Sequence, residues 1–126
     1  MFIIKHLLLD IYIKNNDEEY IYKDIPCKYK ENKYIFNIDE DKYEIIKKDN
    51  IVFHKKNNES VIDFEFKDNV ITKGTYYIKE LSFYMDAKIK TNKYLVDDNN
   101  IDIEYKLWLQ DEEIGDFIFK IKERSE

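Results

Sequence analysis

The stretch TKGTYYIKELSFYMDAKI, residues 72–89, contains one of the two glycines of the chain and its longest regular alternation of apolar and polar side chains. One parity is apolar and consists of Leu81, Phe83, Met85, Ala87 and Ile89. The other parity is mostly polar and consists of Glu80, Ser82, Tyr84, Asp86 and Lys88. A period of two over this length is typical of a half-buried β-strand and does not fit a helix. We therefore expect a strand that directs its apolar side chains into the core.

Shorter runs of the same kind lie on both sides of this stretch, separated by turns rich in Asn and Asp. They cover residues 3–13, 20–29, 33–38, 42–47, 51–56, 60–66, 70–72, 94–96, 101–109 and 114–122. With two glycines and one proline in the chain, Asn and Asp must form most of the turns. Only in residues 2–13 does a helix compete, and the β-branched residues and missing N-cap there favour a strand.

The number of runs and the length of the turns predict the fold class. Short polar turns can only join antiparallel neighbours. Exposed strand edges promote aggregation, and closing the sheet into a barrel removes them. We therefore expect an all-β fold, in which an antiparallel meander closes into a barrel of about 8–10 strands. A two-sheet sandwich is the alternative.

The chain is long enough for one domain with a core of its own, at 126 residues. The predicted domain covers residues 1–122. The polar tail ERSE, residues 123–126, is expected to fray. Eleven tyrosines and eight phenylalanines add to the preference for sheet, because aromatic side chains favour pleated surfaces.

The charge and hydropathy of the chain limit the classes of partner that it can bind. The net charge is −6 and both signs are interleaved, whereas a nucleic-acid-binding surface needs a basic stripe. No apolar run approaches the roughly 18 residues of a membrane span. The apolar N-terminus is interrupted by Asp10 and lacks the flanks of a signal peptide. A single cysteine, Cys27, fits a reducing compartment. We expect a cytoplasmic protein that binds neither nucleic acid nor membranes.

The residues that most often carry chemistry are few. His6 and His54 are the only histidines, and no spacing typical of a metal site connects them to other ligands. Cys27 has no neighbouring His to activate its thiol. Acidic residues at alternate positions are typical of solvated strand faces, and such pairs are Asp39/Asp41, Asp63/Glu65 and Asp102/Glu104. We predict no catalytic residue, metal or cofactor. An enzyme would need a carboxylate–histidine pair inside the barrel.

Three aromatic residues are expected on the outer surface. Trp108 falls on the polar parity of its strand, and Tyr12 and Tyr84 fall on comparable parities. Exposed aromatic side chains that gather in one patch are typical of interaction surfaces. We predict that these three residues form a contact patch for a partner or for a second copy of the chain.

Several motifs of the second half follow a known pattern. They are Thr72, Gly74 and the following YYIKEL, then Ile103, Tyr105 and Leu107, and the final hairpin with Gly115 and its F-x-F-x-I run. In these motifs the chain resembles the DUF1934 (YwiB-like) family of small bacterial proteins, and the likeness covers about half of the chain. The resemblance implies a calycin-like, lipocalin-like barrel of unknown function, with a cavity that such barrels often use for a small ligand.

Two functional hypotheses follow. The first is a non-catalytic binding module for a small apolar or amphipathic ligand. The inner-face residues expected to contact that ligand are Leu81, Phe83, Met85, Tyr105, Leu107, Phe117 and Phe119. Side chains can instead fill a barrel of about eight strands completely, and this alternative stays open. The second hypothesis is a structural protein that acts as a homodimer through the patch of Tyr12, Tyr84 and Trp108, with no ligand.

Overall fold

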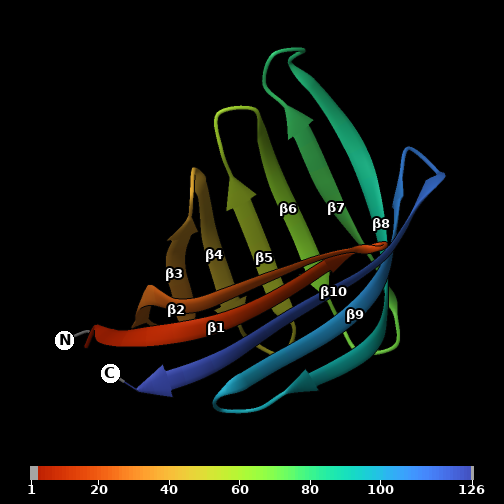
Figure 1. Cartoon of the computed structure of the whole chain (residues 1–126). Coiled ribbons are helices and arrows are strands. Elements are labelled where there is room, and N and C mark those ends of the chain that lie inside the picture. Colours follow the sequence, from red (N-terminus) through yellow and green to blue (C-terminus); the bar gives the residue numbers. More distant parts are fainter. Residues whose placement is uncertain (1–2, 126) are drawn as a thin grey trace.

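The fold consists of ten β-strands joined by short turns, as the computed structural model of residues 3–125 shows (Figure 1). Met1, Phe2 and Glu126, which belong to the predicted domain and tail, lie outside the described residues. The strands are β1 (Lys5–Asn15), β2 (Glu18–Lys30), β3 (Lys33–Ile38), β4 (Asp41–Lys47), β5 (Ile51–Lys56), β6 (Ser60–Phe66), β7 (Ile71–Ile78), β8 (Phe83–Val96), β9 (Asn100–Leu109) and β10 (Glu112–Ser125).

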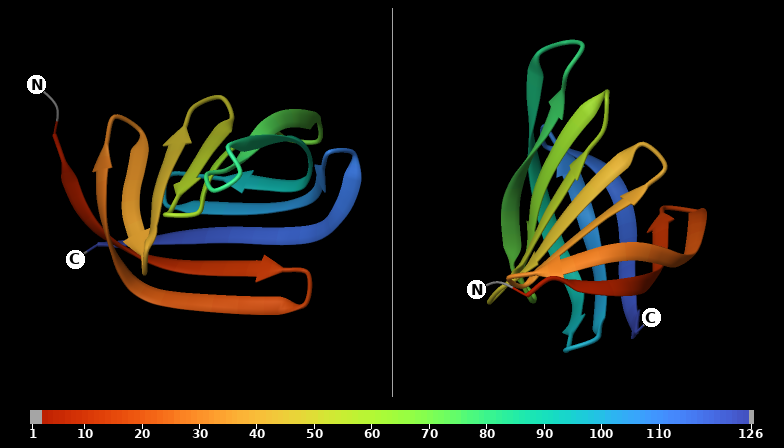
Figure 2. Two further views of the ribbon diagram at one scale, coloured as in Figure 1. Left: turned by 90° about the horizontal axis from the view of Figure 1, so that it is seen from above. Right: turned by 90° about the vertical axis from the view of Figure 1, so that its left-hand side faces the viewer.

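The strands form one closed antiparallel barrel. Each strand pairs with the next along the chain, and β1 also pairs with β10, which closes the circle. The two further views in Figure 2 show long, strongly curved strands on one side and shorter hairpins on the other. The prediction of an all-β meander closed into a barrel is confirmed. The alternative of a two-sheet sandwich is wrong, because the hydrogen-bonded order is continuous around the barrel.

Alternation along each strand builds the core. Leu9 on β1, Ile45 on β4, Ile89 on β8 and Ile103 on β9 have no exposed surface, and the residues beside them in sequence face outward or are only partly buried. Fully burying an aliphatic side chain of this size contributes about 1.5–3 kcal/mol. The inner faces of all these strands therefore stabilise one shared interior.

The stretch 72–89 forms a hairpin, and the strand predicted from the alternation that starts at Glu80 begins only at Phe83. β7 ends at Ile78 and β8 begins at Phe83, with a turn between them in which Ser82 has φ = 46°. Leu81 lies in this turn and is 67% exposed, and Phe83 is 45% exposed at the start of β8. The prediction that both face the interior is wrong. The alternation of apolar residues continues through the turn sequence, so periodicity alone did not reveal where the chain reverses.

β8 is longer than its alternation indicated. The predicted separate run 94–96 belongs to β8, which continues to Val96. Its register with β9 shifts between Thr91 and Lys93, so the strand contains a bulge at Asn92. A bulge inserts one residue into one strand and reverses the parity beyond it. The reversal is why the simple alternation appears to stop at Thr91 although the strand does not.

The two ends of the chain form adjacent strands. β1 pairs with β10 from Leu7 opposite Ser125 to Asn15 opposite Phe117. The tail predicted to fray is therefore part of β10 as far as residue 125, because β1 supplies its backbone partners. The competing helix in residues 2–13 is also wrong, since β1 begins at Lys5.

Asn and Asp form most of the turns, as the low glycine content predicted. Among the described residues, nine non-glycine residues have positive φ, and six of them are Asn or Asp: Asn16, Asp24, Asn32, Asp39, Asn69 and Asp111. These residues tolerate the left-handed region better than others do. Within residues 3–125 no helix has the length and apolarity that a membrane span requires.

Gly74 lies where the backbone of β7 is close to β6. A β-carbon at this position would lie 2.9 Å from Cδ1 of Phe64 and nearer still to the carbonyl oxygen of Asp63. Two residues earlier, Thr72 pairs with Ile89 of β8 and has no ladder partner on β6, where its hydroxyl donates to the carbonyl of Glu65 instead. Gly74 therefore sets the spacing at which the ring of Phe64 packs inside the barrel.

We predict that Gly74→Ala lowers the free energy of unfolding by about 1–3 kcal/mol, because the methyl group must displace either the backbone of β6 or the Phe64 ring. Urea denaturation followed by circular dichroism measures the change. Lys73→Ala, at the exposed neighbouring position, is the control and is expected to change stability by less than about 0.5 kcal/mol. Equal losses of stability in the two variants would contradict the close approach of β7 to β6 at Gly74.

Candidate functional site

The barrel has a cavity that opens at one end. This end carries the turns that join β1 to β2, β3 to β4, β5 to β6, β7 to β8 and β9 to β10. The cavity has a volume of about 580 Å³ and is lined by Ile13, Asn15, Tyr43, Phe53, Lys55, Glu59, Ser60, Ile62, Phe64, Tyr76, Ile78, Met85, Tyr105, Leu107, Leu109, Ile114, Phe117, Ile118 and Phe119. These residues come from eight of the ten strands, so the cavity belongs to the barrel interior.

Aromatic rings form a continuous layer in the wall of the cavity. The Phe53 ring centroid lies 5.9 Å from that of Tyr43 and 5.3 Å from that of Phe119. The Tyr105 ring centroid lies 5.4 Å from that of Phe117, and their planes differ by 22°. Rings at these separations attract one another beyond the gain from burial. The layer is therefore a fixed wall against which a flat or apolar molecule can pack.

Two tyrosine hydroxyls of the cavity lack hydrogen-bond partners. Tyr43 is only 3% exposed and Tyr105 is partly buried, and both line the cavity. Among residues 3–125, neither hydroxyl donates to or accepts from another side chain or the backbone. Burial raises the pKa of both tyrosines above the ordinary value. Each hydroxyl is a neutral donor and acceptor that remains available to a molecule in the cavity.

Polar residues gather on one side of the mouth. Lys55 Nζ lies 3.6 Å from Asp41 Oδ2 and 5.6 Å from the ring centroid of Tyr43. The other carboxylate oxygen of Asp41 accepts a hydrogen bond of 2.8 Å from Asn57 Nδ2. Asn57 Oδ1 in turn accepts the backbone N–H groups of Glu59 and Ser60, each at 2.8 Å. The network holds Lys55 against the wall and orders the turn between β5 and β6.

The opposite end of the barrel is closed by a polar network. The Tyr34 hydroxyl donates to Glu123 Oε2 at 2.9 Å. Lys47 Nζ donates to this hydroxyl at 3.3 Å and to the backbone carbonyl of Asp97 at 2.8 Å. Burial raises the pKa of Tyr34, and its hydrogen bond to Glu123 acts in the same direction. Since these groups satisfy one another, this end is a plug and the mouth is the route into the cavity.

The predicted ligand-lining residues divide into two groups. Met85, Tyr105, Leu107, Phe117 and Phe119 line the cavity. Leu81 and Phe83 do not belong to its lining, because the turn between β7 and β8 carries them beyond the wall. Contact of the five lining residues with a ligand stays a prediction. Tyr43 and Phe53 also line the cavity but were not among the predicted contacts, although KYEIIK and IVFHKK alternate with the period of a strand.

The structure does not bring the three predicted patch residues together. Tyr12 shares a row with Lys120 and Asp102, and Trp108 lies six residues beyond Asp102 on β9, about 20 Å along the strand. Tyr84 is 63% exposed near the tip of the β7–β8 hairpin, and its ring packs on that of Tyr77 at 4.3 Å. The three side chains are separate exposed or half-exposed aromatic groups.

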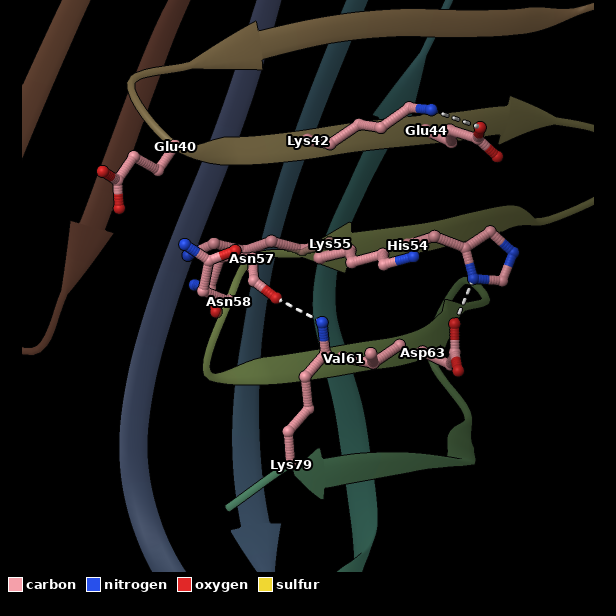
Figure 3. A pocket seen from close by; sticks show the side chains of 11 residues that line it. Glu40, Lys42, Glu44, His54, Lys55, Asn57, Asn58, Val61, Asp63 and Lys79 are labelled. Atoms are coloured by element: carbon pink, nitrogen blue, oxygen red, sulfur yellow. Dashed lines mark hydrogen bonds and ion pairs between the residues drawn. The ribbon is translucent and has the colours of Figure 1, made fainter. Parts of the chain in front are cut away.

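A second hollow lies on the outer wall over β4, β5 and β6 (Figure 3). It measures about 530 Å³. His54 and Asp63 face each other across β5 and β6, with an ion pair or hydrogen bond between His54 Nδ1 and Asp63 Oδ1. Glu44 flanks His54 on β4. This carboxylate–histidine pair is half-exposed and lies on the outer wall, whereas an enzyme would need such a pair inside the barrel. The pairing of His54 with Asp63 depends on strand register, which their separation of nine residues does not reveal.

The remaining candidate residues have structural surroundings. Cys27 is buried, and burial raises the pKa of its thiol to about 11. His6 is exposed near the start of β1. Lys93 pairs with both Asp102 and Glu104, at 3.0 and 3.5 Å. No group of three or more His, Cys, Asp or Glu side chains in the described part of the chain is arranged to hold a metal ion.

These features define a small closed antiparallel barrel, plugged at one end and with an aromatic-lined cavity that opens at the other. A search of solved structures finds the same fold in the ywiB protein from Bacillus subtilis. The match has a TM-score of 0.54 and 10% sequence identity, and it covers 98% of this chain and 94% of that chain. The chain therefore has a YwiB-like fold. No family model matches the sequence, and no curated protein matches it.

We predict that the buried tyrosines make stability sensitive to alkaline pH. Tyr43 and Tyr105 stay protonated in the folded state, whereas the unfolded chain ionises them near their ordinary pKa of 10. Their contribution is fully present below that pH, and above it the free energy of unfolding falls by about 1.4 kcal/mol per pH unit for each group. Urea denaturation at several pH values measures the slope. Tyr105→Phe is expected to have a shallower slope, and equal slopes would contradict burial of this hydroxyl.

Proposed function

We propose that this protein is a non-catalytic binding module that holds a small apolar or amphipathic molecule in its barrel cavity. The observation that carries the proposal is the cavity of about 580 Å³ with its aromatic wall. Ligand pockets typically have volumes of about 300–1,000 Å³ and combine an apolar lining with a few polar groups. We also assign the chain to the DUF1934 family and expect a calycin-like, cytoplasmic protein without enzymatic activity.

The amphipathic character of the ligand follows from the polar groups of the cavity. Within residues 3–125 the hydroxyls of Tyr43 and Tyr105 form no hydrogen bond, and neither oxygen is a fully buried atom. Both hydroxyls are therefore open to a molecule in the cavity. A ligand with one hydrogen-bonding group can pair with one of them while its apolar body packs on the rings, and a purely aliphatic ligand cannot.

Cavity filling tests the proposal. We predict that Met85→Trp weakens binding of the neutral fluorophore Nile red at least about tenfold, because the larger side chain occupies the space that the ligand needs. Fluorescence titration measures the affinity. Tyr84→Trp, which adds a Trp at the neighbouring position on the outer face, is the control and is expected to bind Nile red as the wild type does.

The outcome of this comparison is decisive for the site. Wild-type protein that binds no Nile red, or a Met85→Trp variant with unchanged affinity, would contradict binding in the cavity. Native mass spectrometry of protein purified from its own source provides a second readout, since a bound small molecule adds its own mass to that of the chain.

The alternative function is a homodimer formed through the outer surface. The observation that favours it is the pair of rings of Tyr84 and Tyr77 beside the exposed Leu81 at the hairpin tip. If this surface forms a dimer, light scattering after size exclusion gives twice the mass of the chain, and Tyr84→Lys restores the monomer. A wild-type monomer at high concentration would discard the alternative and leave the cavity proposal unaffected.

A further inference from the structure

We propose that the molecule held in the cavity is an organic cation, an amine or quaternary ammonium group on an apolar or aromatic body. The inference rests on the proposed function and names its ligand class. It is carried by three features of the structure: the rings that line the cavity, the charges around its mouth, and the neutralised state of its one lysine.

The rings suit a cation better than they suit an anion. Seven of the nineteen lining residues are aromatic: Tyr43, Phe53, Phe64, Tyr76, Tyr105, Phe117 and Phe119. The face of an aromatic ring carries partial negative charge and attracts ammonium groups, more strongly where water is excluded. The hydroxyls of Tyr43 and Tyr105 also present lone pairs that can accept a hydrogen bond from an amine.

The mouth of the cavity is surrounded by negative charge. The five turns at this end, residues 16–17, 39–40, 57–59, 79–82 and 110–111, contain six acidic residues and one lysine. The acidic residues are Asp17, Asp39, Glu40, Glu59, Glu80 and Asp111, and all six are exposed. The single lysine, Lys79, donates to the backbone carbonyl of Asn57 at 2.7 Å. The excess of acidic residues in these turns raises the local concentration of cationic ligands and disfavours anionic ones.

Glu59 connects the mouth to the cavity. It is one of the lining residues, and its backbone is held by hydrogen bonds to Asn57 on one side and to the N–H of Lys79 on the other, the latter at 2.9 Å. Within residues 3–125 its carboxylate has no ion-pair partner. An uncompensated carboxylate at the entrance of an aromatic cavity is a ready counter-ion for a cationic head group.

Lys55 does not make the cavity favour an anion over a cation. Among the described residues it is the only cationic side chain of the lining, and therefore the one lining group whose charge would attract an anionic ligand. Asp41 already holds its ammonium group at 3.6 Å, and Asn57 fixes the position of Asp41. Lys55 and Glu59 together give the lining no net charge, and the carboxylate of Asp41 compensates the ammonium group of Lys55. An anionic ligand would have to compete with Asp41 for Lys55.

A series of ligands that share one body tests the inference. The probes are naphthylmethyl-trimethylammonium, naphthylethanol and naphthylacetate, which carry a positive charge, no charge and a negative charge. Isothermal titration calorimetry at low salt is expected to give the cation at least about tenfold higher affinity than the anion. The preference is expected to shrink as sodium chloride is added, because salt screens the exposed carboxylates.

Two variants that each remove one negative charge test where the preference for the cation arises. Glu59→Gln is expected to weaken binding of the cation about threefold or more and to leave naphthylethanol unchanged. Asp68→Asn makes the same change in net charge in an exposed turn at the plugged end, and is expected to have no effect on either ligand. Equal affinities of the two variants for the cation would overturn the role assigned to Glu59.

The experiments distinguish a wrong ligand class from a wrong proposed function. If naphthylacetate binds as tightly as the cation or more tightly, or if naphthylethanol binds best, the cavity is a binding site but the inferred ligand class is wrong. If none of the three probes binds and Nile red also fails to bind, the proposed function itself is overturned. A preference for the cation that is smaller in the Glu59→Gln variant supports both the ligand class and the proposed function.

Discussion

The pairing of β1 with β10 is the interaction on which the rest of the structure depends. It joins the two ends of the chain over nine residue pairs, from Leu7–Ser125 to Asn15–Phe117. Without it, both strands would present unpaired N–H and C=O groups along an open edge. Asn16 continues the seam beyond β1, since its backbone N–H donates to the carbonyl of Asp116 at 2.9 Å. Closure converts ten half-buried strands into one enclosed interior.

Closure also makes the two ends of the barrel different. At the end with the chain termini, Tyr34, Lys47 and Glu123 satisfy one another's polar groups above tightly packed aliphatic residues. At the other end, the hydroxyls of Tyr43 and Tyr105 have no hydrogen-bond partner among residues 3–125. The inward-facing side chains of the strands therefore form a packed core in one half of the barrel and a cavity with polar groups at its edge in the other half. The contrast leaves space in one half of the barrel, whereas side chains fill the other half.

The sequence predicted the strands well where polar turns interrupt the alternation of apolar and polar residues. It did not predict features that leave no local pattern in the sequence, such as a turn that keeps the alternation. Residues 33–38, 51–56 and 60–66 form strands with the predicted bounds. The reversal at Lys79–Ser82 escaped because Glu80-Leu81-Ser82 keeps the period of two. Whether the interior is full or hollow, and which outer residues meet, as His54 and Asp63 do, depends on register and barrel size. These are properties of the closed sheet as a whole.

The central claim is that β1 and β10 close the barrel, and nuclear Overhauser contacts between the two strands test it most directly. In isotope-labelled protein, the account predicts backbone proton contacts between Ile11 and Ile121 and between Ile13 and Phe119, the pairs of the antiparallel ladder. It also predicts slow amide exchange along both strands. Absence of these contacts, with fast exchange at the facing amides of β1 and β10, would show an open sheet and contradict the enclosed cavity.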